Sequence, residues 1–356
     1  MHMGFRWFGT GFDKIPLGYI RQIPGIEGVV TTLYDKQAGE SWERERISAM
    51  KKEVEQHGLS ILGIESVNIH DSIKTGEPDR DKHIETYIDT IRMLSSEGIK
   101  LICYNFMPVF DWTRSDLAKM RPDGATVFSY DQELIDQVDP LEMFGKMDGS
   151  SNGYLLPGWE PERMARIKDL FDMYEPVDQE GLFTNLEYFL KAVIPVCEKE
   201  GLKMAIHPDD PAWPVFGLPR IASSKEHLLR IINMVDSPSN GVTVCTGSLG
   251  SNPDNDIPGI IRSLKGRIGF AHIRNVIHNA PGKFDEAAHL STDGSLDMFE
   301  ITKALYETGF DGIVRPDHGR DIWGEKGMPG YGLYDRALGI AYINGMWEAL
   351  SKTYPK

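Results

Sequence analysis

Four side chains that can bind a metal ion occur in order along the second half of the chain. Each one ends or closely follows a short apolar run; the four are His207, Cys245, His272 and Asp317. Imidazole nitrogen, thiolate sulfur and carboxylate oxygen are ligands for divalent first-row metals. If the apolar runs are neighbouring parallel strands, these side chains meet at one rim of a sheet. The sequence therefore predicts a metal site at that rim.

A structural explanation exists for each of these residues taken alone. A single histidine at a strand end is more often a hydrogen-bonded polar residue, and a single buried cysteine is usually a small hydrophobic residue. Four such residues in the same layer of successive strands favour the metal site over coincidence. Cys103 and Cys197 have no such neighbours along the sequence, so we interpret both as core residues.

Two further residues are candidates for proton transfer. His318 lies next to Asp317 and need not itself bind the metal, which makes it a natural general acid or base. Tyr331 lies in the glycine-rich segment 327–332, where small neighbours would let its hydroxyl group reach inward. The alternative is that these glycines serve only turns.

Polar and aromatic residues near the strand ends are candidates for substrate binding. Arg274 and Asn275 follow His272 closely, and a guanidinium group suits a substrate carboxylate, although a salt bridge is the structural alternative. Asp209 could bind substrate hydroxyl groups or orient His207, or it could belong to a turn. Trp7 would suit the face of a sugar, or would pack the end of the barrel.

Eight short β-rich runs, separated by helical patterns, must position these residues. The runs are Phe5–Phe8, Val29–Leu33, Ile61–Val67, Leu101–Phe106, Met204–His207, Val242–Cys245, Ile268–Ile273 and Ile313–Arg315. Strands buried on both faces read as continuous apolar runs, and eight of them with intervening helices fit a closed α/β barrel. We predict one (β/α)8 TIM-barrel domain over residues 1–356. An open doubly wound sheet is the alternative, but the glycine-rich loop of a dinucleotide-binding version is absent.

Helix boundaries support this alternation, with one interruption. Helical patterns over 42–57 and 81–97 each stop at a glycine and lead directly into a strand. Thr184 and Glu187 have the spacing of a capping box, which predicts a helix from there to Gly201. Residues 107–181 form a large insertion after the fourth strand, where a short loop and a helix are expected. We predict that it covers the barrel mouth as a lid or forms an oligomer contact, with a surface elaboration as the alternative.

Composition and charge exclude several classes of protein. With 38 Lys and Arg against 53 Asp and Glu, the formal net charge is −15, which argues against a nucleic-acid surface. No apolar run approaches the length of a membrane span, and the first residues do not resemble a secretory signal. Three widely spaced cysteines do not make a disulfide framework. We expect a cytoplasmic protein without membrane or nucleic-acid partners.

The chain resembles the D-mannonate dehydratase family, whose members have a xylose-isomerase-like (β/α)8 barrel. The resemblance covers essentially the whole length and is carried by six blocks, of which the last three are the most specific: Gly4–Gly9, Glu65–His70, Tyr104–Val109, Ile206–Pro211, Ala271–Asn275 and Arg315–Arg320. It implies elimination of water from D-mannonate to give 2-dehydro-3-deoxy-D-gluconate, in hexuronate catabolism.

The same resemblance implies a cofactor and a set of site residues. The metal would be Mn²⁺ or Fe²⁺, held by the four strand-end ligands, with His318 and Tyr331 as catalytic partners and a homo-oligomer, a dimer, as the assembly. A thiolate with two imidazoles would by affinity alone favour Zn²⁺, so the preference must come from geometry or metal availability. Residues in or near these blocks are expected to bind the substrate: Trp7, Asn105, Asp209, Arg274, Asn275 and Arg320.

Other classes of function remain as alternatives. A sugar isomerase or epimerase could use the same barrel, but such sites usually place several carboxylates around the metal, and here Asp317 is the main acid, with Glu65 and Asp209 as candidates. A barrel-type DNA-repair endonuclease conflicts with the negative net charge. A sugar-acid-binding barrel with a structural metal is the non-enzymatic alternative, since four protein ligands could fill the coordination shell.

Overall fold

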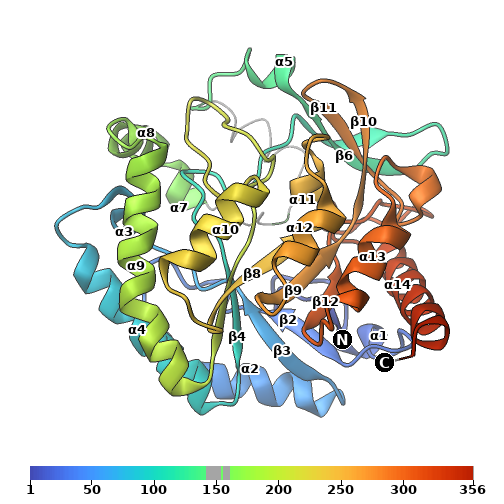
Figure 1. Cartoon of the computed structure of the whole chain (residues 1–356), viewed down its shortest axis with the longest axis horizontal. Helices are drawn as coiled ribbons and strands as arrows, with labels where there is room; N and C mark the ends of the chain where they lie inside the picture. The colour runs from blue at the N-terminus through green and yellow to red at the C-terminus, as the bar shows by residue number, and fades with distance from the viewer. Residues whose placement is uncertain (142–153, 155–160, 356) are drawn as a thin grey trace.

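The protein folds into a closed parallel barrel surrounded by helices (Figure 1). The computed structural model describes residues 1–141, 154 and 161–355. Around the barrel the strands follow one another in the order β1, β12, β9, β8, β7, β4, β3 and β2. Their bounds are β1 His2–Arg6, β2 Gly28–Thr31, β3 Ser60–Glu65, β4 Leu101–Tyr104, β7 Lys203–Ile206, β8 Asn240–Cys245, β9 Ile268–Ile273 and β12 Ile313–Pro316. The predicted (β/α)8 barrel is confirmed, with strand boundaries shifted by up to three residues.

The strands are apolar because both of their faces are buried. Inside the barrel, a small cluster packs from β2, β4, β7, β9 and β12: Val30, Leu101, Cys103, Ala205, Phe270 and Ile313. Outside, a much larger core fills the space between the strands and the helices. Burial on two sides explains why the strands read as unbroken apolar runs rather than as alternating ones.

Helices follow most of the barrel strands and cover them from outside. Their bounds are α1 Leu17–Ile20, α2 Arg44–Gln56, α3 Asp71–Thr75, α4 Arg80–Ser96, α5 Gln132–Ile135, α7 Pro161–Met164, α8 Ile167–Tyr174, α9 Gln179–Glu200, α10 Lys225–Met234, α11 Thr246–Gly250, α12 Ile257–Ser263, α13 Met298–Glu307 and α14 Tyr334–Thr353, with a short 3₁₀ helix at Ser291–Asp293. The predicted helices over 42–57 and 81–97 correspond to α2 and α4. Each is followed by a glycine with positive φ, Gly58 and Gly98, as the sequence indicates.

The predicted start of α9 is wrong. The helix begins at Gln179, five residues before Thr184, and its N-cap is Asp178, whose carboxylate accepts a hydrogen bond from the backbone N–H of Gly181 at 2.7 Å. Thr184 lies inside the helix, where its hydroxyl group donates to the carbonyl oxygen of Glu180. The spacing of Thr184 and Glu187 matches a capping box, but the helix is capped by Asp178, which satisfies one of the first-turn N–H donors.

We expect Asp178→Ala to destabilise the protein by about 1 kcal/mol, because it removes the only side-chain oxygen that the structure places at this N-cap among the described residues. Thr184→Ala is the matched control. It should change the free energy of unfolding by no more than a few tenths of about 1 kcal/mol, since alanine is a good interior helix residue. Chemical denaturation of both variants measures the difference. A larger loss for Thr184→Ala would show that the helix begins at Thr184 after all.

A second, smaller sheet lies beside the barrel (Figure 1). It is antiparallel with the strand order β10, β11, β6, β5, and its strands are β5 Asp116–Met120, β6 Thr126–Asp131, β10 Asn275–Ala280 and β11 Lys283–Ala287. The first two strands belong to the insertion over 107–181, of which residues 142–153 and 155–160 lie outside the described residues. The other two form a hairpin directly after β9, which the sequence analysis did not predict. The pairing of β6 with β11 connects the insertion to this hairpin.

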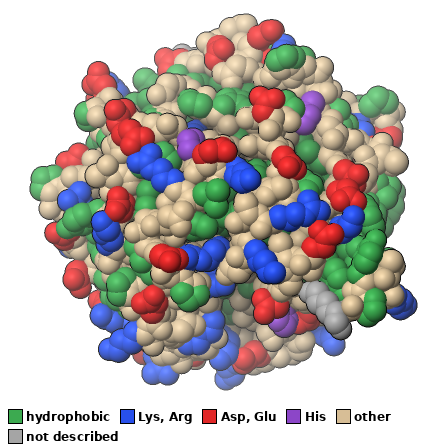
Figure 2. Space-filling view, in the orientation of Figure 1, with side chains coloured by type: hydrophobic (Ala, Val, Ile, Leu, Met, Phe, Trp, Pro, Cys, Tyr) green, Lys and Arg blue, Asp and Glu red, His purple; other side chains and the backbone are tan. Residues whose placement is uncertain are grey.

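The surface carries charges of both signs. On the face drawn in Figure 2, acidic and basic side chains are interspersed. Among the residues that the structure describes, no helix combines the length and the hydrophobicity that crossing a bilayer requires.

Candidate active site and metal centre

Four barrel strands deliver the metal-binding side chains at their carboxyl ends. His207 directly follows β7, Cys245 ends β8, His272 lies one residue before the end of β9, and Asp317 directly follows β12. Because the strands are parallel and adjacent, these ends share one rim, and the strand register pairs Cys245 with His272. The topology thus places all four residues on one side of the barrel mouth.

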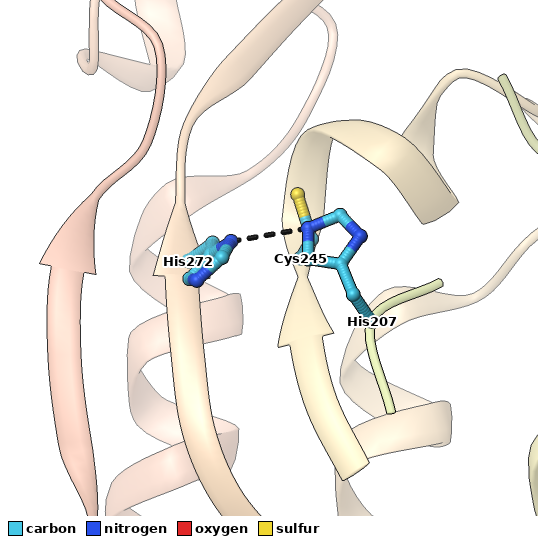
Figure 3. A group of neighbouring side chains, drawn as sticks. All are labelled: His207, Cys245 and His272. Atoms are coloured by element: carbon cyan, nitrogen blue, oxygen red, sulfur yellow. Dashed lines mark hydrogen bonds between the residues drawn. The ribbon is translucent and has the colours of Figure 1, made fainter. Parts of the chain in front are cut away.

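Three of these side chains converge closely (Figure 3). Donor atoms of His207, Cys245 and His272 all lie within 4.8 Å of one another, and Nε2 of His207 is 3.1 Å from Nδ1 of His272. Asp317 lies against this group, with Oδ2 3.3 Å from Sγ of Cys245 and Oδ1 3.7 Å from Nδ1 of His272. Two nitrogens, a sulfur and a carboxylate around one space are a suitable ligand set for a divalent cation.

The hydrogen bonds of the two imidazoles favour lone pairs that face this space. Nδ1 of His207 lies 2.7 Å from the carbonyl oxygen of Pro208, which can only accept, so Nδ1 carries the proton and Nε2 is free. Nε2 of the buried His272 is 3.5 Å from a carboxylate oxygen of Glu65 and has no hydrogen-bond partner among the described residues. The carboxylate favours a proton there, and Nδ1 then presents a lone pair, which lies 3.4 Å from Nη2 of Arg315. Nε2 of His207 and Nδ1 of His272 face each other at 3.1 Å, and this pair of nitrogens suits a metal ion.

Asp317 is held as a carboxylate. Its oxygens accept hydrogen bonds or ion pairs from Nε of Arg274 at 2.7 Å and Nη1 of Arg315 at 3.0 Å. Burial alone would raise the pKa of Asp317, but the positive charges of His318, Arg315 and their neighbours outweigh it and hold the pKa well below its usual range. The carboxylate is therefore ionised and ready to bind a cation.

His318 lies between Glu286 and Tyr331 and forms a hydrogen bond with each of them. Its Nδ1 lies 2.6 Å from Oε1 of Glu286, and its Nε2 lies 2.9 Å from the hydroxyl group of Tyr331. Burial would raise the pKa of Glu286, but the charges of His318 and Arg274 hold it below its usual range, so Glu286 accepts the Nδ1 proton. Burial and the charge of Asp317 raise the pKa of Tyr331, so its hydroxyl group stays protonated and donates to Nε2. The three residues form a chain Glu286···His318···Tyr331 with defined proton positions.

A cavity of about 100 Å³ opens at this rim. Five of the predicted site residues line it: Asn105, His207, Asp317, His318 and Tyr331. Arg6, Glu65 and Asp210 also line it, and Trp112 and Phe128 pack against the ring of His318. His318 and Tyr331 therefore face the same cavity as two of the predicted metal ligands, His207 and Asp317, whereas Cys245 and His272 do not line it.

Comparisons with known proteins show which family the chain belongs to. A family model described as D-mannonate dehydratase matches residues 1–356. The chain belongs to the D-mannonate dehydratase family. A mannonate dehydratase from Brachyspira hyodysenteriae is 65% identical over 352 residues, 99% of each chain. The crystal structure of mannonate dehydratase from Streptococcus suis serotype 2 superposes with a TM-score of 0.91 at 43% identity, covering 100% of this chain and 96% of that one.

Membership in the D-mannonate dehydratase family makes the protein a hydro-lyase that acts on a small sugar acid. A more distant likeness places its barrel among xylose-isomerase-like folds. A xylose-isomerase-like TIM barrel protein from Mycobacterium smegmatis, solved in complex with magnesium, superposes with a TM-score of 0.54 at 14% identity, over 98% of this chain and 96% of that one. That likeness concerns the fold alone, and it agrees with the predicted fold class.

Five residues predicted to bind the substrate of this D-mannonate dehydratase do not line the cavity. Arg274 is buried and bound to three carboxylates, those of Asp210, Glu286 and Asp317, which is the salt-bridge alternative. The remaining four contact other parts of the protein: Trp7 packs in the core, Asp209 accepts from the backbone of Ala222, Asn275 bonds the backbone of Leu290 and Leu296, and Arg320 pairs with Asp335 and Asp123.

Sequence reasoning missed other residues of the site. Glu286 lies on β11, in a hairpin without a recognisable motif, and only its acidic type hints at a role. The sequence suggests Glu65 only as one of the carboxylates of an isomerase site. In the structure, Nη2 of Arg315 donates two hydrogen bonds to its carboxylate, at 2.8 and 3.1 Å. The interpretation of Cys103 as a core residue is confirmed, since it is buried in the cluster inside the barrel. It does have possible ligand neighbours in space, because its sulfur lies in a second group of possible ligand atoms with Glu65 and His272. Neighbours across a barrel cannot be read from sequence distance.

Proposed function

We propose that the protein dehydrates D-mannonate to 2-dehydro-3-deoxy-D-gluconate with a divalent cation, Mn²⁺ or Fe²⁺, in hexuronate catabolism. His207, Cys245, His272 and Asp317 would hold the cation. The observation that carries the proposal is the close approach of His207, Cys245 and His272, with the carboxylate of Asp317 beside them, next to a cavity that His207, Asp317, His318 and Tyr331 line.

The difficult step is removal of the proton on carbon 2, because the adjacent carboxylate is already negative and resists further charge. A bound divalent cation would supply Lewis-acid stabilisation of that developing charge, worth several kcal/mol. His207, Cys245, His272 and Asp317 would hold this positive charge at the barrel rim, next to the proton-transfer chain.

We assign the base to His318 and the acid to Tyr331. When the Tyr331 hydroxyl group turns from Nε2 of His318 toward the substrate, Nε2 takes the proton from carbon 2, and the phenol protonates the hydroxyl group that leaves carbon 3 as water. The C–H electron pair becomes the new double bond between carbons 2 and 3, and the resulting enol tautomerises to the 2-keto acid. Because Nε2 and the phenolate oxygen are hydrogen-bond neighbours at 2.9 Å, one proton transfer between them restores both residues.

Glu286 acts on this reaction through His318. Its carboxylate accepts the Nδ1 proton and fixes which ring nitrogen is free, and the positive charge that His318 acquires is stabilised at 2.6 Å. Arg114 binds both Glu286 and Asp210, so it ties this carboxylate to the insertion over 107–181. Within the single barrel domain that we propose, this insertion would act as a lid or an oligomer contact.

The wider setting of the enzyme follows from the same family. We propose a homodimer in the cytoplasm, with Asn105 in contact with the substrate, since it is the predicted binding residue that lines the cavity. The negative net charge of −15 agrees with the absence of nucleic-acid partners.

Incubating the purified protein with Mn²⁺ and D-mannonate should yield a 3-deoxy-2-keto acid, detected by the periodate–thiobarbiturate reaction. Chelation should abolish the product, and added Mn²⁺ or Fe²⁺ should restore it, because the cation stabilises the charge developed in the difficult step. Metal analysis of the same samples gives the ion and its stoichiometry. Product formation that is unaffected by complete metal removal would contradict the metal dependence, and an isomerised aldonate without the 3-deoxy product would indicate an isomerase.

A further inference from the structure

The cavity contains one buried arginine that no carboxylate of the described residues binds. Arg6 is the last residue of β1, is 5% exposed and lines the cavity together with Asp317, His318 and Tyr331. Other buried arginines nearby are bound to acids: Arg114 to Asp210 and Glu286, and Arg315 to Glu65 and Asp317. Arg6 thus differs from Arg114 and Arg315 in having no ion pair among the described residues. Arg336 also has none there, but its three nitrogens donate to backbone carbonyl oxygens and it does not line the cavity.

The contacts of Arg6 leave much of its guanidinium group free. Nη1 donates to the carbonyl oxygens of Trp7 and Val30, at 3.3 and 3.4 Å, and the group lies over the ring of Phe8 at 4.3 Å. Nε and Nη2 have no hydrogen-bond partner within the described part of the chain. Burial lowers the pKa of Arg6, which reflects the cost of keeping this charge away from water. A buried charge of this kind is stable when an anion binds it.

We propose that Arg6 binds the carboxylate of the substrate in the cavity. The inference rests on the proposed function, in which that substrate is D-mannonate. A guanidinium group has the planar pair of donors that matches a carboxylate, and it would offset the charge that makes the proton on carbon 2 hard to remove. Arg6 is therefore expected to serve both binding and catalysis.

Other cations near the cavity are less suitable for this role. Arg274, the sequence-based candidate, has its nitrogens engaged by three carboxylates. Lys36 lines the cavity where it meets a second cavity of about 350 Å³, but its ammonium group pairs with Glu43 at 2.8 Å. As an alternative, Arg6 could serve only to neutralise the negative charge of Glu65. Arg315 already binds that carboxylate at 2.8 Å, however.

The experiment compares a charged and an uncharged ligand. Steady-state kinetics with D-mannonate, and competitive inhibition by D-mannitol, which lacks the carboxylate, are measured for the metal-loaded wild type, Arg6→Gln, Arg6→Lys and Arg21→Gln. Arg21 is exposed at the end of α1, so Arg21→Gln removes the same charge outside the site. Thermal melting monitors the folding of each variant.

We expect Arg6→Gln to raise the KM for D-mannonate about tenfold to a hundredfold, with a lower kcat, and to leave inhibition by D-mannitol within about twofold of the wild type. Arg6→Lys should retain part of the affinity, and Arg21→Gln should match the wild type. An unchanged KM in Arg6→Gln, or an equal loss of affinity for both ligands, would overturn the proposal.

Two further outcomes are covered by the same set of proteins. If the wild type forms no dehydration product, the proposed function fails, and calorimetric titration of wild type and Arg6→Gln with D-mannonate still tests the contact: equal affinity would disprove it. If Arg6→Gln does not fold, Arg6→Lys decides, because a lysine cannot reproduce the two-pronged contact. D-mannonate affinity in Arg6→Lys equal to that of the wild type would then count against the proposal.

Discussion

Cys245→Ala is expected to lose at least about a thousandfold in kcat/KM for D-mannonate and to be purified with little bound metal. Cys245 provides the only sulfur in its group of donor atoms among the described residues, and its removal leaves two imidazoles without the thiolate that helps neutralise a divalent cation. Stabilisation by the cation is worth several kcal/mol, and each 1.36 kcal/mol corresponds to a factor of ten in rate. Activity and metal content are measured on the same preparation.

Cys197→Ala is the matched control for this experiment. Cys197 is equally buried but lies on α9, away from the rim, so the substitution removes the same atoms from a packed region without touching the site. Both variants should lose a similar, small amount of stability, and only Cys245→Ala should lose metal and activity. If Cys245→Ala kept the wild-type metal content and rate, the result would show that Cys245 is not a ligand of the metal.

His318→Asn should lower kcat about a hundredfold to ten-thousandfold while the metal stays bound. Asparagine fills a similar space and can still contact Glu286, but it cannot take up a proton as Nε2 of His318 does. Because none of the four proposed ligands is altered, metal analysis should give the same stoichiometry as the wild type. The rate of product formation and the metal content together separate loss of the base from loss of the metal.

Tyr331→Phe extends the same test to the other end of the proton-transfer chain. It removes one hydroxyl group and should also lower kcat within that range, with the metal retained. The double variant should be little worse than either single variant, because the two residues act as one unit. A His318→Asn enzyme that dehydrates D-mannonate at close to the wild-type rate with its metal bound would show that the base lies elsewhere.

The rim of metal-binding residues was predictable because it depends on local sequence and on one topological rule. Each candidate ligand ends a recognisable apolar run, and parallel strands in a closed barrel bring their carboxyl ends together. His207, Cys245 and His272 could therefore be grouped without knowledge of any distance, and the structure brings these three within 4.8 Å.

The features that could not be predicted depend on contacts between residues that lie far apart in the sequence. Arg274 suits a substrate carboxylate by type, but whether it meets a substrate or three protein acids depends on residues up to 64 positions away. Glu286 reaches His318 only because a hairpin folds back over the rim. The predicted start of α9 is wrong because Asp178 and Thr184 are both acceptable caps by residue type, and the structure uses Asp178, whose carboxylate accepts a hydrogen bond from the backbone N–H of Gly181.

The hairpin β10–β11 has a consequence for how this barrel acquired its chemistry. In the proposed mechanism the strand ends would hold the cation, whereas the orientation of His318 comes from Glu286 on β11, which Arg114 of the insertion also binds. Replacing the hairpin by a short turn would then leave a barrel that binds the cation and no longer performs the elimination. Cation affinity and reaction type would be separable in this architecture, by evolution or by a protein engineer.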